Sequence, residues 1–230
     1  IVHVCSAGMT PYRGSRGLAG YVACLAAVLL ASYAVALPAP HGTARWKIKV
    51  SIPATANLSK PMSVSLSDFL SFPDPQPAVK HNDKKYDTVR IPKFPNKLNL
   101  AEGDVVSTVG WLHLVAGEDD GDYHIQISGS STSGTNCLIV ELPHPQTISV
   151  SPSSLRVRYK KVRDFIKKTY LKGKEPATAG TSIRPAQKVV VTGQLFYDDS
   201  HVGDAPRGKK GMKAATLWEI HPITAFQVAP

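Results

Sequence analysis

The chain has 230 residues, a formal net charge of +10 and only three cysteines. This length suits one good-sized domain, or one domain with extensions. The few cysteines exclude a disulfide-stapled mini-protein, and the positive charge favours anionic partners without identifying them. Cys137 lies inside an apolar run, which is typical of a buried and inert thiol.

The N-terminal region has the pattern of a secretory signal. From Met9, two arginines precede the apolar stretch Leu18–Leu30, and Ala34-Val35-Ala36 fits a small-x-small cleavage motif. We interpret residues 1–8 as translation upstream of the true start. The apolar stretch is shorter than the about 20 residues of a membrane-spanning helix. We therefore expect cleavage near Ala36, a secreted or periplasmic mature chain of charge about +8 and no transmembrane span, with an uncleaved anchor as the alternative.

Residues 37–100 are rich in proline and serine and predict an irregular N-terminal extension. Arg45–Ile52 alternates basic and apolar residues, which predicts an edge strand. Ser67–Phe72 predicts a short helical turn. Val79–Lys97 is basic and punctuated by prolines, so we expect an extended arm.

Residues 101–230 predict five strands and one helix. The expected strands are Val105–Val115, Tyr123–Ser128, Cys137–Leu142, Lys188–Tyr197 and Ala214–Val228. Tyr123–Ser128 alternates apolar and polar residues, as a strand with one wet face does. Ser153–Leu171 carries an apolar stripe at helical spacing and ends before Gly173. Pro222 predicts a bend in the last strand.

Three strands, one helix and two strands follow in the order of an OB-type barrel. A sandwich would lack the single helix at this place, and a doubly wound sheet would need more helices. We therefore predict a mainly β fold, an OB-type five-stranded Greek-key barrel with one helix between strands 3 and 4, over residues 101–230.

Histidines and carboxylates gather near the strand ends. Both residue types bind zinc and similar cations, and both serve acid–base chemistry. Structural roles, such as capping turns or pairing with lysines, are the alternative, because no two residues have the spacing of a tight metal motif. The candidate ligand or metal residues are Asp122, His124, Glu141, His144, Asp199, His201, Glu219 and His221.

Basic residues on the helix and before the last strand suggest binding of an anionic polymer. OB barrels bind single strands through basic grooves with stacking aromatics, and Trp111, Tyr123, Phe196 and Trp218 are candidate rings. A solvated helix face and a packed core explain the same residues equally well. The candidate basic residues are Arg156, Lys160, Arg163, Lys167, Lys209 and Lys210.

Four segments resemble a group of uncharacterised secreted bacterial proteins with a C-terminal Glu-x-His-Pro strand. The segments are DDGDYHIQIS, CLIVELPHP, VTGQLFYDDSH and LWEIHPIT, in that order, between Val105 and Val228. The resemblance implies an exported domain and no established activity. The architecture is also similar to periplasmic OB proteins and to the staphylococcal-nuclease family, but a shared fold does not transfer function.

The sequence predicts an exported, non-enzymatic OB-type domain for ligand binding or for envelope or extracellular assembly. The alternative is a metal-assisted, nuclease-like hydrolase that uses the histidines and carboxylates. We expect no cofactor, and partners such as an acidic polymer, an envelope surface or further copies of the chain. Sequence-specific nucleic-acid binding is not expected, because an exported protein meets little cytoplasmic nucleic acid. The DGD tripeptide alone does not indicate a nuclease, because it is common turn chemistry.

Overall fold

The computed structural model describes residues 45–147 and 153–230, and these all fall in one compact unit. The expected signal segment, and the end of the loop expected before the helix, lie outside the described residues. The elements, in chain order, are α1 (Trp46–Lys49), β1 (Met62–Ser63), α2 (Leu66–Leu70), a 3-10 turn (Lys84–Tyr86), β2 (Val105–Gly117), β3 (Tyr123–Ser128), β4 (Leu138–Leu142), α3 (Ser153–Tyr170), β5 (Thr181–Tyr197), a second 3-10 turn (Asp199–His201) and β6 (Trp218–Val228).

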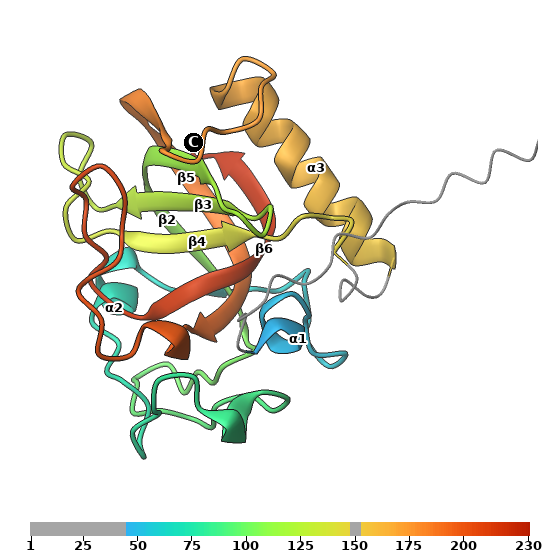
Figure 1. The fold of residues 1–230 in the computed structure, drawn as a ribbon, viewed down its shortest axis with the longest axis vertical. Coiled ribbons are helices and arrows are strands. Elements are labelled where there is room, and N and C mark those ends of the chain that lie inside the picture. The colour runs from blue at the N-terminus through green and yellow to red at the C-terminus, as the bar shows by residue number, and fades with distance from the viewer. Residues whose placement is uncertain (1–44, 148–152) are drawn as a thin grey trace, which may run out of the picture. The chain divides into compact units, whose positions relative to one another are not determined.

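Strands β2 to β6 close into a barrel (Figure 1). The order is β1-β2-β3-β4-β6-β5, and β5 pairs back onto β2. The β4–β6 pair is parallel, whereas the other pairs within the ring are antiparallel. With α3 between β4 and β5, this is the expected OB-type barrel, and the predicted fold class is confirmed.

Alternation along the strands separates an apolar core from a polar face. Ile125, Val140 and Ile220 lie in the hydrophobic core and are fully buried. Val140 is the register partner of both Ile125 and Ile220. Successive strand residues point to opposite sides, so the neighbours of these three residues project from the other face. That face carries His124, Glu141 and His221, and it positions the site described below.

Helix α3 covers the barrel beside β6 (Figure 1). Leu155, Tyr159, Val162 and Ile166 are buried at a spacing of three or four residues, as the sequence predicted. The N–H of Gly173 donates to the carbonyl of Lys167, with Gly173 in the left-handed region at φ 80°. Lys172 also has a positive φ of 53°, and two successive left-handed residues end the helix.

A bulge between β5 and β6 confirms the expected bend at Pro222. Gly193 pairs with Ile223 and Leu195 with Ile220, so the two strands slip past each other at this point. A methyl group on Gly193 would lie 2.3 Å from the carbonyl oxygen of Pro222. Only a glycine permits this approach of the two backbones.

The N-terminal segment packs into the same core as the barrel. Trp46, Phe69 and Leu100 are buried members of that core. The edge strand expected at Arg45–Ile52 is wrong, because Trp46–Lys49 forms a short helix. Trp46 and Val50 both lie in the core, and their four-residue spacing places them on one face of this helical turn. The predicted turn near Ser67 is present as α2, which the Ser65 side chain caps.

A buried ion pair holds the start of this segment to the barrel, and we call it the Arg45 clamp. The Arg45 guanidinium pairs in bidentate fashion with Glu102, and both side chains are fully buried. Arg45 also donates to the carbonyls of Tyr86 (3.1 Å) and Tyr197 (2.8 Å). Glu102 accepts the backbone N–H groups of Ile91 (2.6 Å) and Tyr197 (3.0 Å). Each charged group therefore has a full set of partners.

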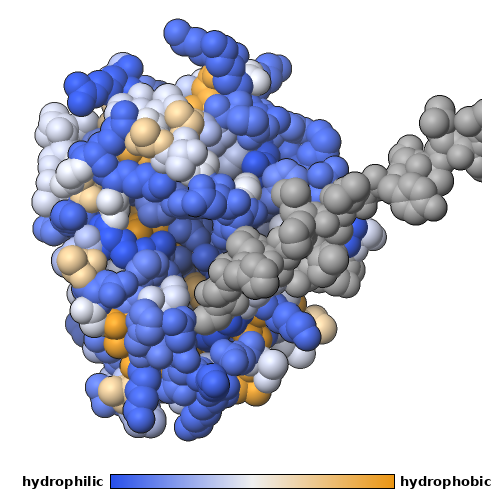
Figure 2. Space-filling view, viewed as in Figure 1, coloured by the Kyte–Doolittle hydropathy of each residue, from blue (hydrophilic) through white to orange (hydrophobic). Residues whose placement is uncertain are grey.

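Polar residues dominate the face of the molecule seen in Figure 2, where apolar residues appear only in small, separate areas. Among residues 45–147 and 153–230, no helix combines the length and the hydropathy that a bilayer-spanning helix needs.

Candidate functional site

A buried polar cluster forms on the face of β3, β4 and β6 that points away from the apolar core. Five of the eight expected ligand residues meet there: Asp122, His124, Glu141, Glu219 and His221. All five are at most 3% exposed. The strands explain the meeting, because His124 and Glu141 are direct register partners and Glu141 follows Val140, the partner of Ile220. Burying so many ionisable groups is costly unless each finds a partner.

His221 lies between three carboxylates. Its Nε2 is 3.5 Å from Asp122 Oδ2, and its Nδ1 is 3.0 Å from Glu141 Oε2 and 3.9 Å from Glu219 Oε2. These contacts are ion pairs without hydrogen-bond geometry. Burial and the Lys49 ammonium lower the pKa of His221, but the three carboxylates outweigh them and raise it to about 10.

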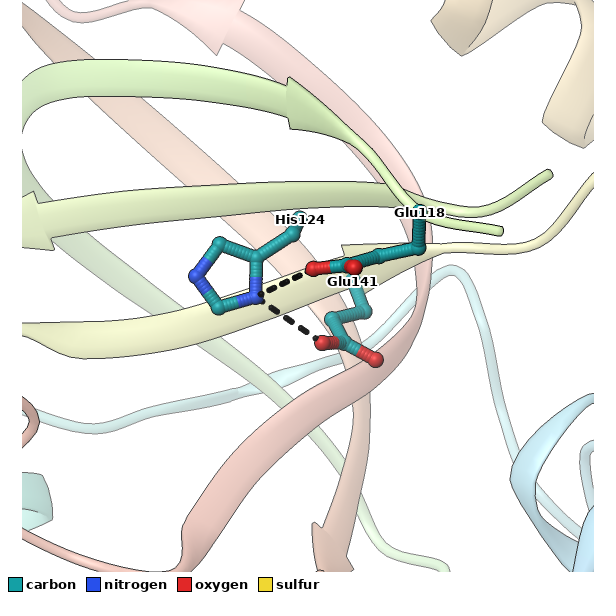
Figure 3. Close-up of side chains that lie close together, drawn as sticks. All are labelled: Glu118, His124 and Glu141. Atoms are coloured by element: carbon teal, nitrogen blue, oxygen red, sulfur yellow. Dashed lines mark hydrogen bonds and ion pairs between the residues drawn. The ribbon is translucent and has the colours of Figure 1, made fainter. Parts of the chain in front are cut away.

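His124 faces two other carboxylate oxygens (Figure 3). Its Nδ1 is 3.2 Å from Glu141 Oε1 and 3.4 Å from Glu118 Oε1. Its Nε2 is 3.1 Å from Gln126 Oε1. That amide oxygen also accepts the N–H of Lys209 at 2.7 Å, so it is an acceptor and His124 Nε2 is the donor. In a neutral His124, the lone pair of Nδ1 therefore points at two carboxylates.

Three permanent cations contact the carboxylates of the cluster. Lys49 from α1 lies 3.1 Å from Glu141 Oε2. Arg207, from the loop between β5 and β6, pairs with Asp198, Glu219 and Glu141. Lys209 lies 3.1 Å from Glu118 Oε1. Burial alone would raise the pKa of Glu141, but Lys49 and the two histidines hold it well below its usual value.

Around the cluster, the carboxylates nevertheless outnumber the lysine and arginine side chains. Six lie in or beside it among the described residues: Glu118, Asp120, Asp122, Glu141, Asp198 and Glu219. Against them stand Lys49, Arg207 and Lys209. The surplus of negative charge requires protons on the histidines or added cations.

Within residues 45–147 and 153–230, two groups of three residues have the geometry to bind a metal ion. Glu118, His124 and Glu141 form one, and Asp122, Glu141 and His221 form the other. In each group the three candidate ligand atoms lie within 4.8 Å of one another. Glu141 belongs to both groups. An imidazole nitrogen with carboxylate oxygens is a usual ligand set for zinc and similar cations.

The other three expected ligand residues have different partners. The backbone N–H of His144 donates to Asp122 Oδ1 at 3.0 Å, and its ring nitrogen Nδ1 accepts the N–H of Gln146. Asp199 accepts the N–H of Asp83 from the N-terminal segment. His201 is partly exposed and lies 2.8 Å from Asp204. These three residues follow strand ends in the sequence, but their side chains contact nearby residues or, in the case of Asp199, the N-terminal segment.

Several of the expected anionic-polymer residues are engaged within the chain. Arg163 is buried, with its guanidinium 3.6 Å from the centre of the Tyr123 ring. Lys160 pairs with Asp164, Lys167 with Glu175, and Lys209 with Glu118. Arg156 and Lys210 are exposed. Of the expected stacking rings, Tyr123, Phe196 and Trp218 are buried, so they are core residues rather than a stacking platform.

Sequence reasoning missed Glu118 and Lys49 as parts of this cluster. Glu118 opens the acidic turn after β2, and that turn returns it to His124 at the start of β3. The acidic EDDGD run was the available signal, although turn chemistry explained it equally well. Lys49 gave no signal, because its segment was expected to be a strand. Arg207 also belongs to the cluster, because three carboxylates surround it.

No protein-family model matches the chain, and no curated protein matches its sequence. The resemblance to secreted bacterial proteins therefore stays a prediction.

Proposed function

We propose that this chain is an exported OB-type ligand-binding domain whose ligand is a divalent metal cation, held by Glu118, His124 and Glu141. One observation carries the proposal: His124 Nδ1 faces two carboxylate oxygens, while the other ring nitrogen contacts Gln126. That arrangement is repulsive unless a positive charge lies between the three atoms. A metal ion supplies that charge and uses all three groups as ligands.

The atom spacing suits a metal of the size of zinc. Tetrahedral zinc with bonds of about 2.0 Å has ligand atoms about 3.3 Å apart. His124 Nδ1 lies 3.2 Å and 3.4 Å from its two carboxylate oxygens. Gln126 accepts the N–H of the other ring nitrogen, which is the outer-shell contact that normally orients a metal-bound histidine.

The place of the site in the barrel also supports ligand binding. OB folds bind their ligands on the face of their second and third strands, beside the loops that follow the first and fourth strands. In this chain those strands are β3 and β4. The loop after β2 supplies Glu118, and the loop after β5 supplies Arg207 and Lys209. The Glu118 side chain is 32% exposed, so the site has a route to solvent.

Arg207 and Lys209 contact the same carboxylate oxygens that would bind the ion. A carboxylate oxygen has two lone pairs, so Arg207 can stay while Glu141 Oε1 takes a metal bond. Lys209 has a flexible stem and a side chain that is 24% exposed, so it can move into water as an ion arrives.

The test is zinc binding by metal-stripped protein, measured by titration calorimetry on wild type, Glu118→Gln and Asp119→Asn. Asp119 is exposed in the same turn, so its variant is a matched control. Glu118→Gln should weaken binding at the His124 site at least about ten-fold, as loss of a metal-site contact does. Asp119→Asn should leave it unchanged. Equal affinities in the two variants, or no zinc bound by wild type, would contradict the proposal.

Metal-assisted hydrolysis is a second candidate function, and the shared Glu141 favours it. Paired ions that share ligands are common in phosphatases and nucleases. The same zinc-loaded samples, incubated with a chromogenic phosphodiester, distinguish the two functions. Turnover by wild type that disappears in Glu118→Gln would make the domain a hydrolase. Zinc binding without turnover supports a binding domain.

A further inference from the structure

We infer that a second divalent cation binds between Asp122, Glu141 and His221, and that Glu141 bridges it to the ion at His124. The inference deepens the proposed function and rests on it for the first ion only. The three residues come from the start of β3, from β4 and from β6. Their ligand atoms lie within 4.8 Å of one another.

The first support is a set of unsatisfied atoms in a fully buried place. His221 is 0% exposed, and neither ring nitrogen has a hydrogen-bond partner. Asp122 Oδ2 is also buried without one, and it lies 3.5 Å from His221 Nε2. Buried polar atoms nearly always find a partner, so this nitrogen and this carboxylate oxygen, which face each other, indicate a proton or a metal ion between them.

The second support is how Glu141 divides its two oxygens. Oε1 lies 3.2 Å from His124 Nδ1, and Oε2 lies 3.0 Å from His221 Nδ1. Each oxygen therefore faces one of the two ligand groups. A carboxylate with this orientation can bind one ion on each oxygen, as in two-metal sites with ions about 3.5–4 Å apart.

The third support is an outer contact that orients Asp122. Its Oδ1 accepts the backbone N–H of His144 at 3.0 Å, which leaves Oδ2 directed at His221. Metal-binding carboxylates are usually fixed by such a hydrogen bond. The role of His144 is therefore to hold a ligand through its backbone.

Lys49 occupies part of the space beside this group. Its ammonium lies 3.1 Å from Glu141 Oε2, and its side chain is 15% exposed. The ammonium sits on a flexible four-carbon stem. We expect the incoming ion to replace the ammonium at Glu141 and Lys49 to move toward solvent. The carboxylates that exceed the permanent cations around the cluster favour this exchange.

The experiment counts bound ions. Metal-stripped protein is equilibrated with excess manganese or zinc and passed through a desalting column, and bound metal is measured by mass spectrometry. Wild type should retain two ions per chain. Asp122→Asn should retain one, because the amide keeps Oδ1 for His144 but loses the ligand charge. Glu118→Gln should also retain one, whereas Asp119→Asn should retain two.

The two proposals fail in different ways in this experiment. One ion in wild type that Asp122→Asn keeps and Glu118→Gln loses overturns the second site, and means that His221 holds a proton only. One ion that Glu118→Gln keeps and Asp122→Asn loses supports the Asp122 group and overturns the function proposed at His124. No bound ion in wild type overturns both. If Asp122→Asn does not fold, as judged by circular dichroism, His221→Gln replaces it with the same expected count.

Electron paramagnetic resonance of the manganese-loaded protein tests the bridge separately. Two ions joined by Glu141 should give a spin-coupled spectrum in wild type, and the six-line spectrum of a single ion in Asp122→Asn and in Glu118→Gln. Two bound ions with only the isolated six-line signal would overturn the bridging role of Glu141.

Discussion

The Arg45 clamp and the cluster around Glu141 are both buried and ionic, but they differ in how completely their polar atoms are paired. In the clamp, Arg45 and Glu102 bind each other in bidentate fashion and form hydrogen bonds with backbone groups of three further residues. In the cluster, both nitrogens of His221 and one oxygen each of Asp122 and Glu219 lack a hydrogen bond.

This difference supports a structural role for the clamp and the proposed binding role for the cluster. A buried ion pair with all its hydrogen bonds made has no capacity for a further partner, and it stabilises one arrangement of the chain. A buried cluster with unpaired atoms and surplus negative charge has lost hydration without full replacement. Binding of a cation therefore stabilises such a site, whereas it would not stabilise the clamp.

Arg45→Ala tests the structural side of the comparison and should have the largest effect. Removing the guanidinium leaves Glu102 charged and buried, which typically costs about 3–5 kcal/mol of unfolding free energy. Urea denaturation with and without saturating zinc measures this loss. Because the clamp binds no ion, zinc should stabilise the variant by as much as it stabilises wild type. A loss below about 1 kcal/mol would show that the clamp is not the structural anchor.

Arg207→Ala tests the binding side and should have an intermediate effect. Asp198, Glu141 and Glu219 lose their shared guanidinium, which we expect to cost about 1–3 kcal/mol because the Arg207 side chain is itself partly exposed. Zinc replaces part of the lost positive charge, so it should stabilise this variant more than it stabilises wild type or Arg45→Ala. Equal stabilisation by zinc in all three proteins would remove the distinction between the two regions.

Lys160→Ala provides the reference for an ion pair in water and should have the smallest effect. Lys160 and Asp164 lie one helical turn apart on α3, with side chains 68% and 49% exposed. Such pairs contribute about 0.3–0.5 kcal/mol, and salt weakens them. The same urea experiment in low and high salt measures the change. A loss above about 1 kcal/mol would mean that the helix depends on this pair more than its exposure implies.

The barrel was predictable because its strands and helix carry their own periodic patterns. The alternation in Tyr123–Ser128 correctly predicted a strand, although the expected wet face is wrong because both faces are buried, and the stripe from Leu155 to Ile166 is buried on one side as predicted. The segment before residue 101 has one short period, the alternation in Arg45–Ile52, and it was misleading because this stretch forms a helical turn. Its prolines and single apolar residues reach the core through irregular backbone, so neither α1 nor the clamp was foreseen.

The candidate site was predictable only in part for a related reason. His124, Glu141 and His221 lie near strand ends that a barrel can bring together, and that was enough to group them. The strand pattern does not indicate which side chains from the loops reach the cluster. Glu118 and Arg207 join the cluster through loops, whereas Asp199 and His201 turn to other partners.

The close approach of β5 and β6 at Gly193 also affects the proposed metal sites. At Gly193 the backbone of β5 lies close to Pro222 of β6. The register of β6 on β5 therefore depends on Gly193 having no side chain. His221 immediately precedes Pro222, so a larger residue at 193 would force the strands apart and carry that imidazole away from Glu141. The distance between the two proposed metal positions therefore depends on Gly193 in β5, which belongs to neither group of ligands.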